Sequence, residues 1–257
     1  MIMKSSLLLA ALFLISCAGI QKLPPVPSHR IPDSLARIHR PVGEWEIRGI
    51  GDLDSLIRNT GASVATTNGI LVVDLKGAII DGKKQDGDGG QGERQTPLFR
   101  ARVPFILKNG FIKNNKNAAT FYASNSGVKN MTWLNVGEDA VATADNAKNF
   151  VVQNCEFLND KSGDKSIQLN EADGAEVHNN LVYGGITGVR VGKYDYVTKT
   201  DKANGGGNEF VGVDTAWNLG EMILDIQKQN GYTHVDLPFK TTNGGKVLNA
   251  DGKVKAE

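Results

Sequence analysis

Apolar and polar positions alternate in short runs along the middle of the chain, and one pattern recurs there every twenty-odd residues. In each repeat an apolar residue stands two positions before an asparagine, and another large apolar residue follows three positions after it. The repeats are Leu107-Asn109-Ile112, Val128-Asn130-Trp133, Val152-Asn154-Phe157, Val177-Asn179-Val182 and, less clearly, Asn208-Val211 with Gly206 in the apolar position. Short β-type runs with this period are typical of a solenoid in which every repeat forms one coil.

The pattern predicts an all-β fold, a single-stranded right-handed parallel β-helix with a short N-terminal capping helix. Equivalent residues of neighbouring coils in such a fold lie about 4.8 Å apart, the spacing between strands of a sheet. We therefore expect Asn109, Asn130, Asn154 and Asn179 to stack in one file.

The predicted capping helix lies just before the repeats. Asp52 is expected to cap it, with Leu53, Leu56 and Ile57 on one face and Gly61 as its end. The coils are expected from about residue 62, with the first clear β runs, ILVVD and GAIID, after residue 69. Beyond residue 213 the pattern becomes ragged, and the apolar run MILDI and the terminal segment are expected to form a last coil or an added strand.

Three segments divide the chain: a signal peptide at 1–16, a tether at 17–43 and the β-helix domain at 44–257. Residues 1–16 contain Lys4 and then an apolar stretch too short to span a membrane stably, as in secretory signals. Residues 18–43 hold five of the eight prolines, which is typical of an extended tether.

The end of the signal peptide predicts a lipid anchor. Leu14-Ile15-Ser16-Cys17 resembles the lipobox of bacterial lipoproteins, in which cleavage is coupled to acylation of the cysteine, here Cys17. The alternative is an ordinary signal peptide with an incidental cysteine. By the same resemblance, Ala18 favours the outer membrane. We expect an exported lipoprotein, periplasmic or at the cell surface and held to the membrane through its lipid alone; otherwise the protein would be secreted.

Net charge and cysteine content argue against two further features, nucleic-acid binding and a disulfide bond. A net charge of +1 without a long basic block argues against nucleic acid as a partner. If Cys17 is lipidated, Cys155 has no partner for a disulfide, and its apolar surroundings predict a buried, inert thiol. We expect the protein to be a monomer.

Four charged residues recur at similar places in three consecutive repeats. Glu138 and Asp139, then Lys165, then Arg190 follow the asparagines of their repeats by eight to eleven residues. If the coils stack as predicted, two carboxylates, an amine and a guanidinium line one groove. The alternative is a structural bend with two solvated acids and two surface cations.

The motifs around these residues resemble a known family. GQGERQTPLF, LKNGFI, WLNVGEDA, DKSIQLN and, 25 residues after Lys165, Arg190 are similar, in order, to the motifs of the family 3 polysaccharide lyases, the small pectate lyases. The resemblance implies β-elimination on an acidic polysaccharide, polygalacturonate or a related uronate, with Ca²⁺ as cofactor. It also implies that Glu138 and Asp139 bind the calcium ion, that Lys165 is the base, and that Arg190 belongs to the catalytic set.

The reaction explains why such residues are needed. A base removes the proton on the carbon next to the uronate carboxyl group, and the glycosidic oxygen then leaves. That proton is weakly acidic, so cations must neutralise the carboxylate and the developing charge, a role for Ca²⁺ and for the fixed guanidinium of Arg190. Because a free lysine titrates near 10.4, Lys165 would act at alkaline pH or with a lowered pKa.

Two positions depart from the family. Its third calcium-binding acid falls on Ala118 and its second groove lysine on Thr187. Weaker calcium binding and a substrate other than ordinary pectate would follow, although Asn117 offers a neutral oxygen beside Ala118. The alternatives are a non-catalytic envelope lipoprotein that binds glycans in the same groove, and a purely structural envelope lipoprotein. A hydrolytic glycosidase would need a second cluster of acids, which the sequence does not suggest.

Overall fold

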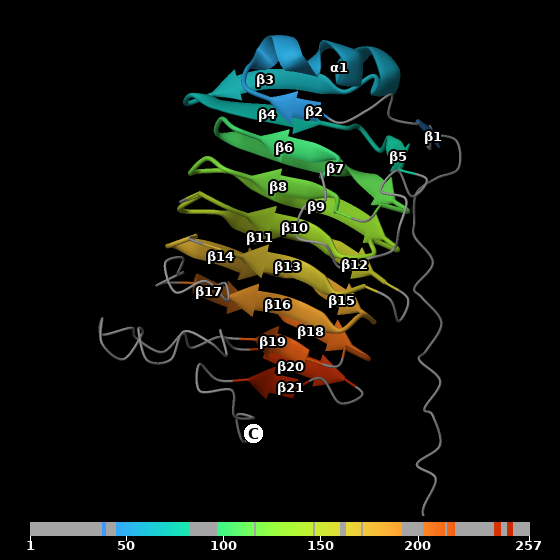
Figure 1. Cartoon of the computed structure of the whole chain (residues 1–257), viewed down its shortest axis with the longest axis vertical. Helices are drawn as coiled ribbons and strands as arrows, with labels where there is room; N and C mark the ends of the chain where they lie inside the picture. Colours follow the sequence, from blue (N-terminus) through green and yellow to red (C-terminus); the bar gives the residue numbers. More distant parts are fainter. Residues whose placement is uncertain are drawn as a thin grey trace, which may run out of the picture.

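The structure, a computed structural model, describes residues 38–39, 45–82, 97–115, 117–145, 147–159, 163–170, 172–191, 203–213, 215–218, 239–242 and 246–248. Its strands form two sheets, and the strands of each sheet stack along the length of the molecule (Figure 1). Sheet B has eight strands in this part of the chain. They are, in spatial order, β2 (Trp45–Ile47), β6 (Phe99–Ala101), β8 (Ala119–Phe121), β10 (Asp139–Thr143), β13 (Lys165–Leu169), β16 (Thr187–Val191), β19 (Thr215–Asn218) and β21 (Lys246–Leu248).

Within the described residues, sheet A contains thirteen strands. One path through it is β1 (Ile38–His39), β5 (Ile79–Asp81), β7 (Phe105–Lys113), β9 (Gly127–Leu134), β12 (Glu156–Leu158), β15 (Leu181–Tyr183), β18 (Asn208–Val211) and β20 (Phe239–Thr242). Beside this path lie β3 (Ser63–Thr67), β4 (Ile70–Asp74), β11 (Val151–Gln153), β14 (Ala175–His178) and β17 (Ala203–Gly206).

Parallel pairing between successive coils gives the molecule its form. Each coil adds one strand to sheet B and one or two to sheet A, and the coils stack into a column (Figure 1). The predicted parallel β-helix is therefore confirmed. The exception is the hairpin β3–β4, which is antiparallel and turns through Asn68 and Gly69, both with positive φ.

The predicted helix covers the N-terminal end of the column (Figure 1). It consists of a 3₁₀ turn, η1 (Ile50–Leu53), followed by α1 (Asp54–Thr60), and Gly61 ends it with a left-handed φ of 70°. Leu53 and Leu56 are buried, so the helix closes the core as expected. Asp52 lies inside the 3₁₀ turn, where its carboxylate accepts the N–H groups of Arg48 and Gly49.

The coils begin earlier than the sequence pattern indicated. β2 precedes the helix and pairs with β6, because Trp45 and Ile47 supply two buried positions on a short alternating strand. Trp45 stacks on Phe99 of the next coil at 4.9 Å between ring centroids. β1, inside the segment 17–43, pairs with β5.

The asparagine file stacks as predicted. Asn109, Asn130, Asn154 and Asn179 all have φ between 51° and 57°, a left-handed conformation that asparagine adopts more readily than most residues. The Asn130 amide donates to Asn109 at 3.0 Å, and Asn154 donates to Asn130 at 3.2 Å. Each asparagine thus forms the same corner of its coil, and the amide bonds tie neighbouring coils together.

The assignment of Asn208 to this file was wrong by one residue. The N–H of Asn179 bonds to the carbonyl of Gly206, which places Gly207, with φ 67°, next in the file. Asn208 instead stacks on Asn180: its Oδ1 accepts from the Asn180 amide at 2.9 Å. A glycine replaces asparagine in the file because it adopts a positive φ without strain.

Large apolar side chains fill the interior. Trp133 stacks on Phe157 with ring centroids 6.1 Å apart and planes 4° apart, while Phe121 lies 4.9 Å from Phe150. Cys155 is buried and free among the described residues, and burial raises the pKa of its thiol to about 12. The predicted burial of this thiol is confirmed.

At the other end of the column, β19, β20 and β21 continue both sheets. The run MILDI lies outside the described residues, as do Cys17 and nearly all of the segments before residue 45. In the part that the structure describes, no helix is long and apolar enough to cross a membrane.

Candidate active site

Sheet B brings most of the predicted site together at the N-terminal ends of its strands. In the strand register Asp139 on β10 pairs with Lys165 on β13, and Lys165 pairs with Thr187 on β16. Residues far apart in the sequence therefore lie one strand spacing apart. Lys165 also donates its backbone N–H to the carbonyl of Glu138 at 3.0 Å, which fixes the acid pair against the lysine.

Lys165 is held between two carboxylates. Its Nζ lies 3.3 Å from Oδ1 of Asp139, an ion pair without hydrogen-bond geometry, and donates a short hydrogen bond to Oδ2 of Asp164. The side chain of Lys165 is 11% exposed, that of Asp139 17% and that of Asp164 20%. Nearly all of this charged cluster is therefore shielded from solvent.

Burial changes the titration of both partners. It raises the pKa of Asp139 from 3.8 to about 6, although Lys165 and Arg190 lower it in part. Burial would also lower the pKa of Lys165, but the attraction of Asp139 and Asp164 outweighs that effect and raises the pKa above 10.5. The lysine in this structure is an ammonium ion at neutral pH.

Arg190 does not share the file of Lys165. It lies three residues farther along β16, where it pairs with Gln168, and Thr187 occupies the position beside the lysine. The Arg190 side chain is buried, and its charge still lowers the pKa of Asp139. Arg190 therefore interacts electrostatically with Asp139 from a position three residues farther along its strand.

The place beside the acid pair belongs to Asn117 and not to Ala118. Oδ1 of Asn117 accepts the N–H of Asp139 at 3.1 Å, and its Nδ2 lies 3.4 Å from Oε2 of Glu138. Ala118 is fully buried in the core. An aspartate at 118 would place a charge in the core, whereas a side chain at 117 lies beside the acid pair.

The donor chemistry of the acid pair fits calcium. Carboxylate and amide oxygens are the ligands that Ca²⁺ prefers, and Glu138 and Asp139 present carboxylates beside the amide of Asn117. Oδ1 of Asp139 is buried and accepts no hydrogen bond from the described residues, but it forms the ion pair with Lys165 at 3.3 Å, so a calcium ion bound there would have to share or displace the ammonium group. No group of three or more His, Cys, Asp or Glu residues suited to a metal occurs among the described residues, so water or substrate would complete the shell.

The family model for pectate lyase matches residues 57–189, which include β10, β13 and most of β16. The chain therefore belongs to the pectate lyase family. No solved structure matches the chain. Family and fold together support a lyase-like role on an acidic polysaccharide.

Proposed function

We propose that the protein cleaves an acidic polyuronate, such as pectate, by calcium-assisted β-elimination. The observation that carries the proposal is the pairing of Asp139 with Lys165 on adjacent strands of a pectate lyase domain. Nζ of Lys165 lies 3.3 Å from Oδ1 of Asp139. A partly buried amine beside a carboxylate is a candidate general base whose protonation depends on its neighbours.

Lys165 is the base in this proposal. Its neutral amine takes the proton from the carbon next to the uronate carboxyl group, the electron pair forms a carbon–carbon double bond, and the glycosidic oxygen leaves. Because Asp139 and Asp164 raise the pKa of Lys165, the neutral amine is scarce at pH 7. Activity should therefore rise with pH, as the fraction of neutral amine rises.

The negative charge of the substrate carboxylate is balanced in this proposal by a calcium ion on the acid pair and by Arg190. Glu138 and Asp139 would hold the calcium ion, which when bound supplies positive charge beside the substrate carboxylate. The planar guanidinium of Arg190 suits two parallel hydrogen bonds to a carboxylate. Arg190 thus positions the uronate while Lys165 reaches the neighbouring proton.

The second candidate function is a glycan-binding module without catalysis. Its supporting observation is the ammonium form of Lys165, clamped between two carboxylates, together with Thr187 in the neighbouring position. A cation locked in this way binds anionic sugars but abstracts no proton. Both candidates share the proposed anchoring of an exported lipoprotein through Cys17.

The test is Lys165→Ala, with Lys148→Ala as the matched control, because Lys148 is an exposed lysine between β10 and β11. Product formation from polygalacturonate should fall about a hundredfold or more, the usual contribution of a general base, while binding of the polymer changes little. The control should keep full activity. Equal activity in the Lys165→Ala variant would remove the lysine from the mechanism.

A further inference from the structure

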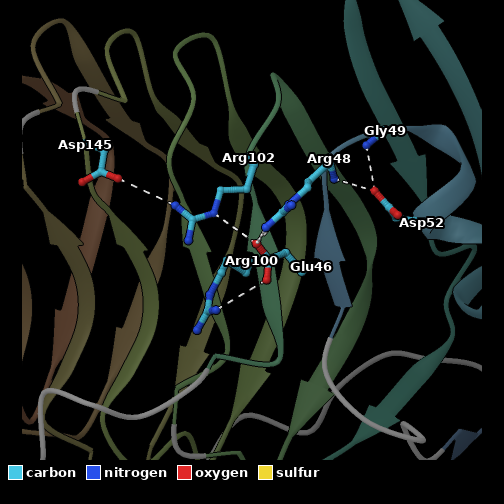
Figure 2. A network of polar contacts seen from close by, with 7 residues as sticks. All are labelled: Glu46, Arg48, Gly49, Asp52, Arg100, Arg102 and Asp145. Atoms are coloured by element: carbon cyan, nitrogen blue, oxygen red, sulfur yellow. Dashed lines mark hydrogen bonds and ion pairs between the residues drawn. The ribbon is translucent and has the colours of Figure 1, made fainter.

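A second cationic site lies on sheet B, toward the helical cap. The arginine patch, made of Arg48, Arg100 and Arg102, surrounds the carboxylate of Glu46 (Figure 2). Arg48 donates two hydrogen bonds to Oε1 of Glu46, at 2.8 and 3.2 Å. Arg102 and Arg100 lie farther away, with closest nitrogen–oxygen distances of 3.5 and 3.6 Å. Three guanidinium groups thus face one carboxylate.

Arg100 and Arg102 keep most of their hydrogen-bonding capacity. A guanidinium has five N–H donors, yet neither side chain donates a hydrogen bond within the described residues. Nε of Arg100 is buried and makes no hydrogen bond to a described residue, so an outside ligand would meet the terminal nitrogens of this side chain, which is 26% exposed. Arg102 stacks on the ring of Tyr122, with Cζ 3.8 Å from the ring centroid, which fixes the plane of its guanidinium. Two oriented forks are therefore available to an outside carboxylate.

Other acids nearby do not occupy these donors. The carboxylate of Asp52 accepts the backbone N–H groups of Arg48 and Gly49. Asp145 reaches Arg102 from the other side at 3.7 Å, and its side chain is 71% exposed (Figure 2). An exposed ion pair at that distance is weak and easily exchanged for another anion.

The strand register connects the patch to the candidate active site. Across sheet B the pairs run from Glu46 and Arg100 through Thr120, Ala142 and Gln168 to Arg190. Four strand spacings, roughly 19 Å in all, separate Arg100 from Arg190. Every position between them in this file is uncharged, and the nearest carboxylate of the candidate active site on β10, that of Asp139, lies three positions before Ala142.

The spacing of the file matches the chemistry of the substrate. A strand spacing of about 4.8 Å is close to the length that one sugar adds to an extended polyuronate, and every sugar carries a carboxylate. A chain that lies along the column with one carboxylate on Arg190 therefore brings another to the patch about four sugars away.

We infer that Arg100 and Arg102 form a remote carboxylate-binding subsite for the same polyuronate chain whose cleavage is proposed at Lys165. The inference rests on the proposed function for the identity of the substrate. In this arrangement Glu46 orients the arginines and competes with the substrate for them. Hydrogen bonds from Arg48 hold the pKa of Glu46 below its ordinary value, so it competes as a carboxylate at neutral pH.

The test compares the double variant Arg100→Gln/Arg102→Gln with a control of equal charge change. Arg58→Gln/Lys129→Gln is suitable, because Arg58 lies on α1 and Lys129 on β9 of sheet A. With long polygalacturonate the first variant should raise KM at least about tenfold and leave kcat unchanged, since it removes charge-assisted contacts far from the reacting bond. With trigalacturonate, which is too short to reach the patch from Arg190, its rates should equal those of the control.

Retardation in a gel that contains polygalacturonate measures binding without cleavage. The double variant should lose retardation that the control keeps, whether or not product forms, and Glu46→Gln should increase retardation by freeing the arginines. Equal retardation and equal KM for the double variant and the control would overturn the subsite and leave the lyase standing. Retention by the unmodified protein without any product would instead refute the lyase alone, and an unmodified protein that neither binds nor cleaves would refute both.

Discussion

Asp139→Asn should make the protein more stable while it damages the site. Burial raises the pKa of Asp139 from 3.8 to about 6, so the folded protein binds this proton more tightly than the unfolded chain. Above about pH 6 Asp139 is ionised in both the folded and the unfolded protein, and its buried charge destabilises the folded protein by the full amount. Below the unfolded value of 3.8 both are protonated and the cost disappears. The free energy of unfolding therefore falls as pH rises through this window.

The magnitude follows from the size of the shift. Each pKa unit corresponds to about 1.4 kcal/mol. The rise in the pKa of Asp139 from 3.8 to about 6 therefore lowers the free energy of unfolding by up to about 3 kcal/mol at pH 7.5. Asparagine keeps the shape of the side chain and removes the charge. The substitution should raise the free energy of unfolding by up to that amount at pH 7.5 and by almost nothing near pH 4.

Urea unfolding of both proteins in the presence of a chelator is the assay. Glu176→Gln serves as control, because Glu176 is an exposed acid on β14 of sheet A and its removal should be nearly neutral. Added calcium should then stabilise the unmodified protein more than the Asp139→Asn variant, since the ion binds only the folded site. A variant that is less stable at pH 7.5, or a gain that is the same at pH 4, would refute the reasoning about burial.

Three further predictions concern other parts of the chain. Asp164→Asn removes a carboxylate that raises the pKa of Lys165, so product formation should rise at lower pH than in the unmodified protein; an unchanged pH profile would exclude Asp164 from control of the base. Gly127→Ala should lower the free energy of unfolding by about 1–3 kcal/mol in urea, because the added Cβ would lie 2.3 Å from the carbonyl oxygen of Val151 on the next coil; a neutral result would mean that the coils separate easily. Cys17→Ser should abolish lipoprotein processing and release the protein from membranes; continued acylation would contradict the proposed anchor.

The regular parts of the fold were predictable from the sequence because one local rule repeats. Each coil needs a residue that accepts a positive φ at the same corner, and asparagine marks that corner at residues 109, 130, 154 and 179. The rule failed at Asn208, because Gly207 meets the same need and moves the register by one position. β2 was missed since it lies before the helix, separated in sequence from the coils that it joins.

The site was less predictable because it depends on register and on side-chain direction. Arg190 and Lys165 follow their asparagines by the same number of residues, yet the turns between sheets differ and leave Arg190 three positions farther along its strand. Ala118 and Asn117 are adjacent in sequence, and only the structure shows that the alanine enters the core while the asparagine meets the acid pair. Asp164 escaped notice, although its place next to Lys165 was a signal.

The central claim is that this groove carries out β-elimination, and one measurement tests it most directly. Unmodified protein is incubated with polygalacturonate at alkaline pH, with calcium or with a chelator, and the ultraviolet absorbance of the unsaturated product is followed. We predict that absorbance rises with calcium, that the chelator suppresses the rise, and that Lys165→Ala abolishes it. No absorbance from polygalacturonate, alginate or other uronates, in a protein that still binds them, would contradict the lyase and leave a glycan-binding module.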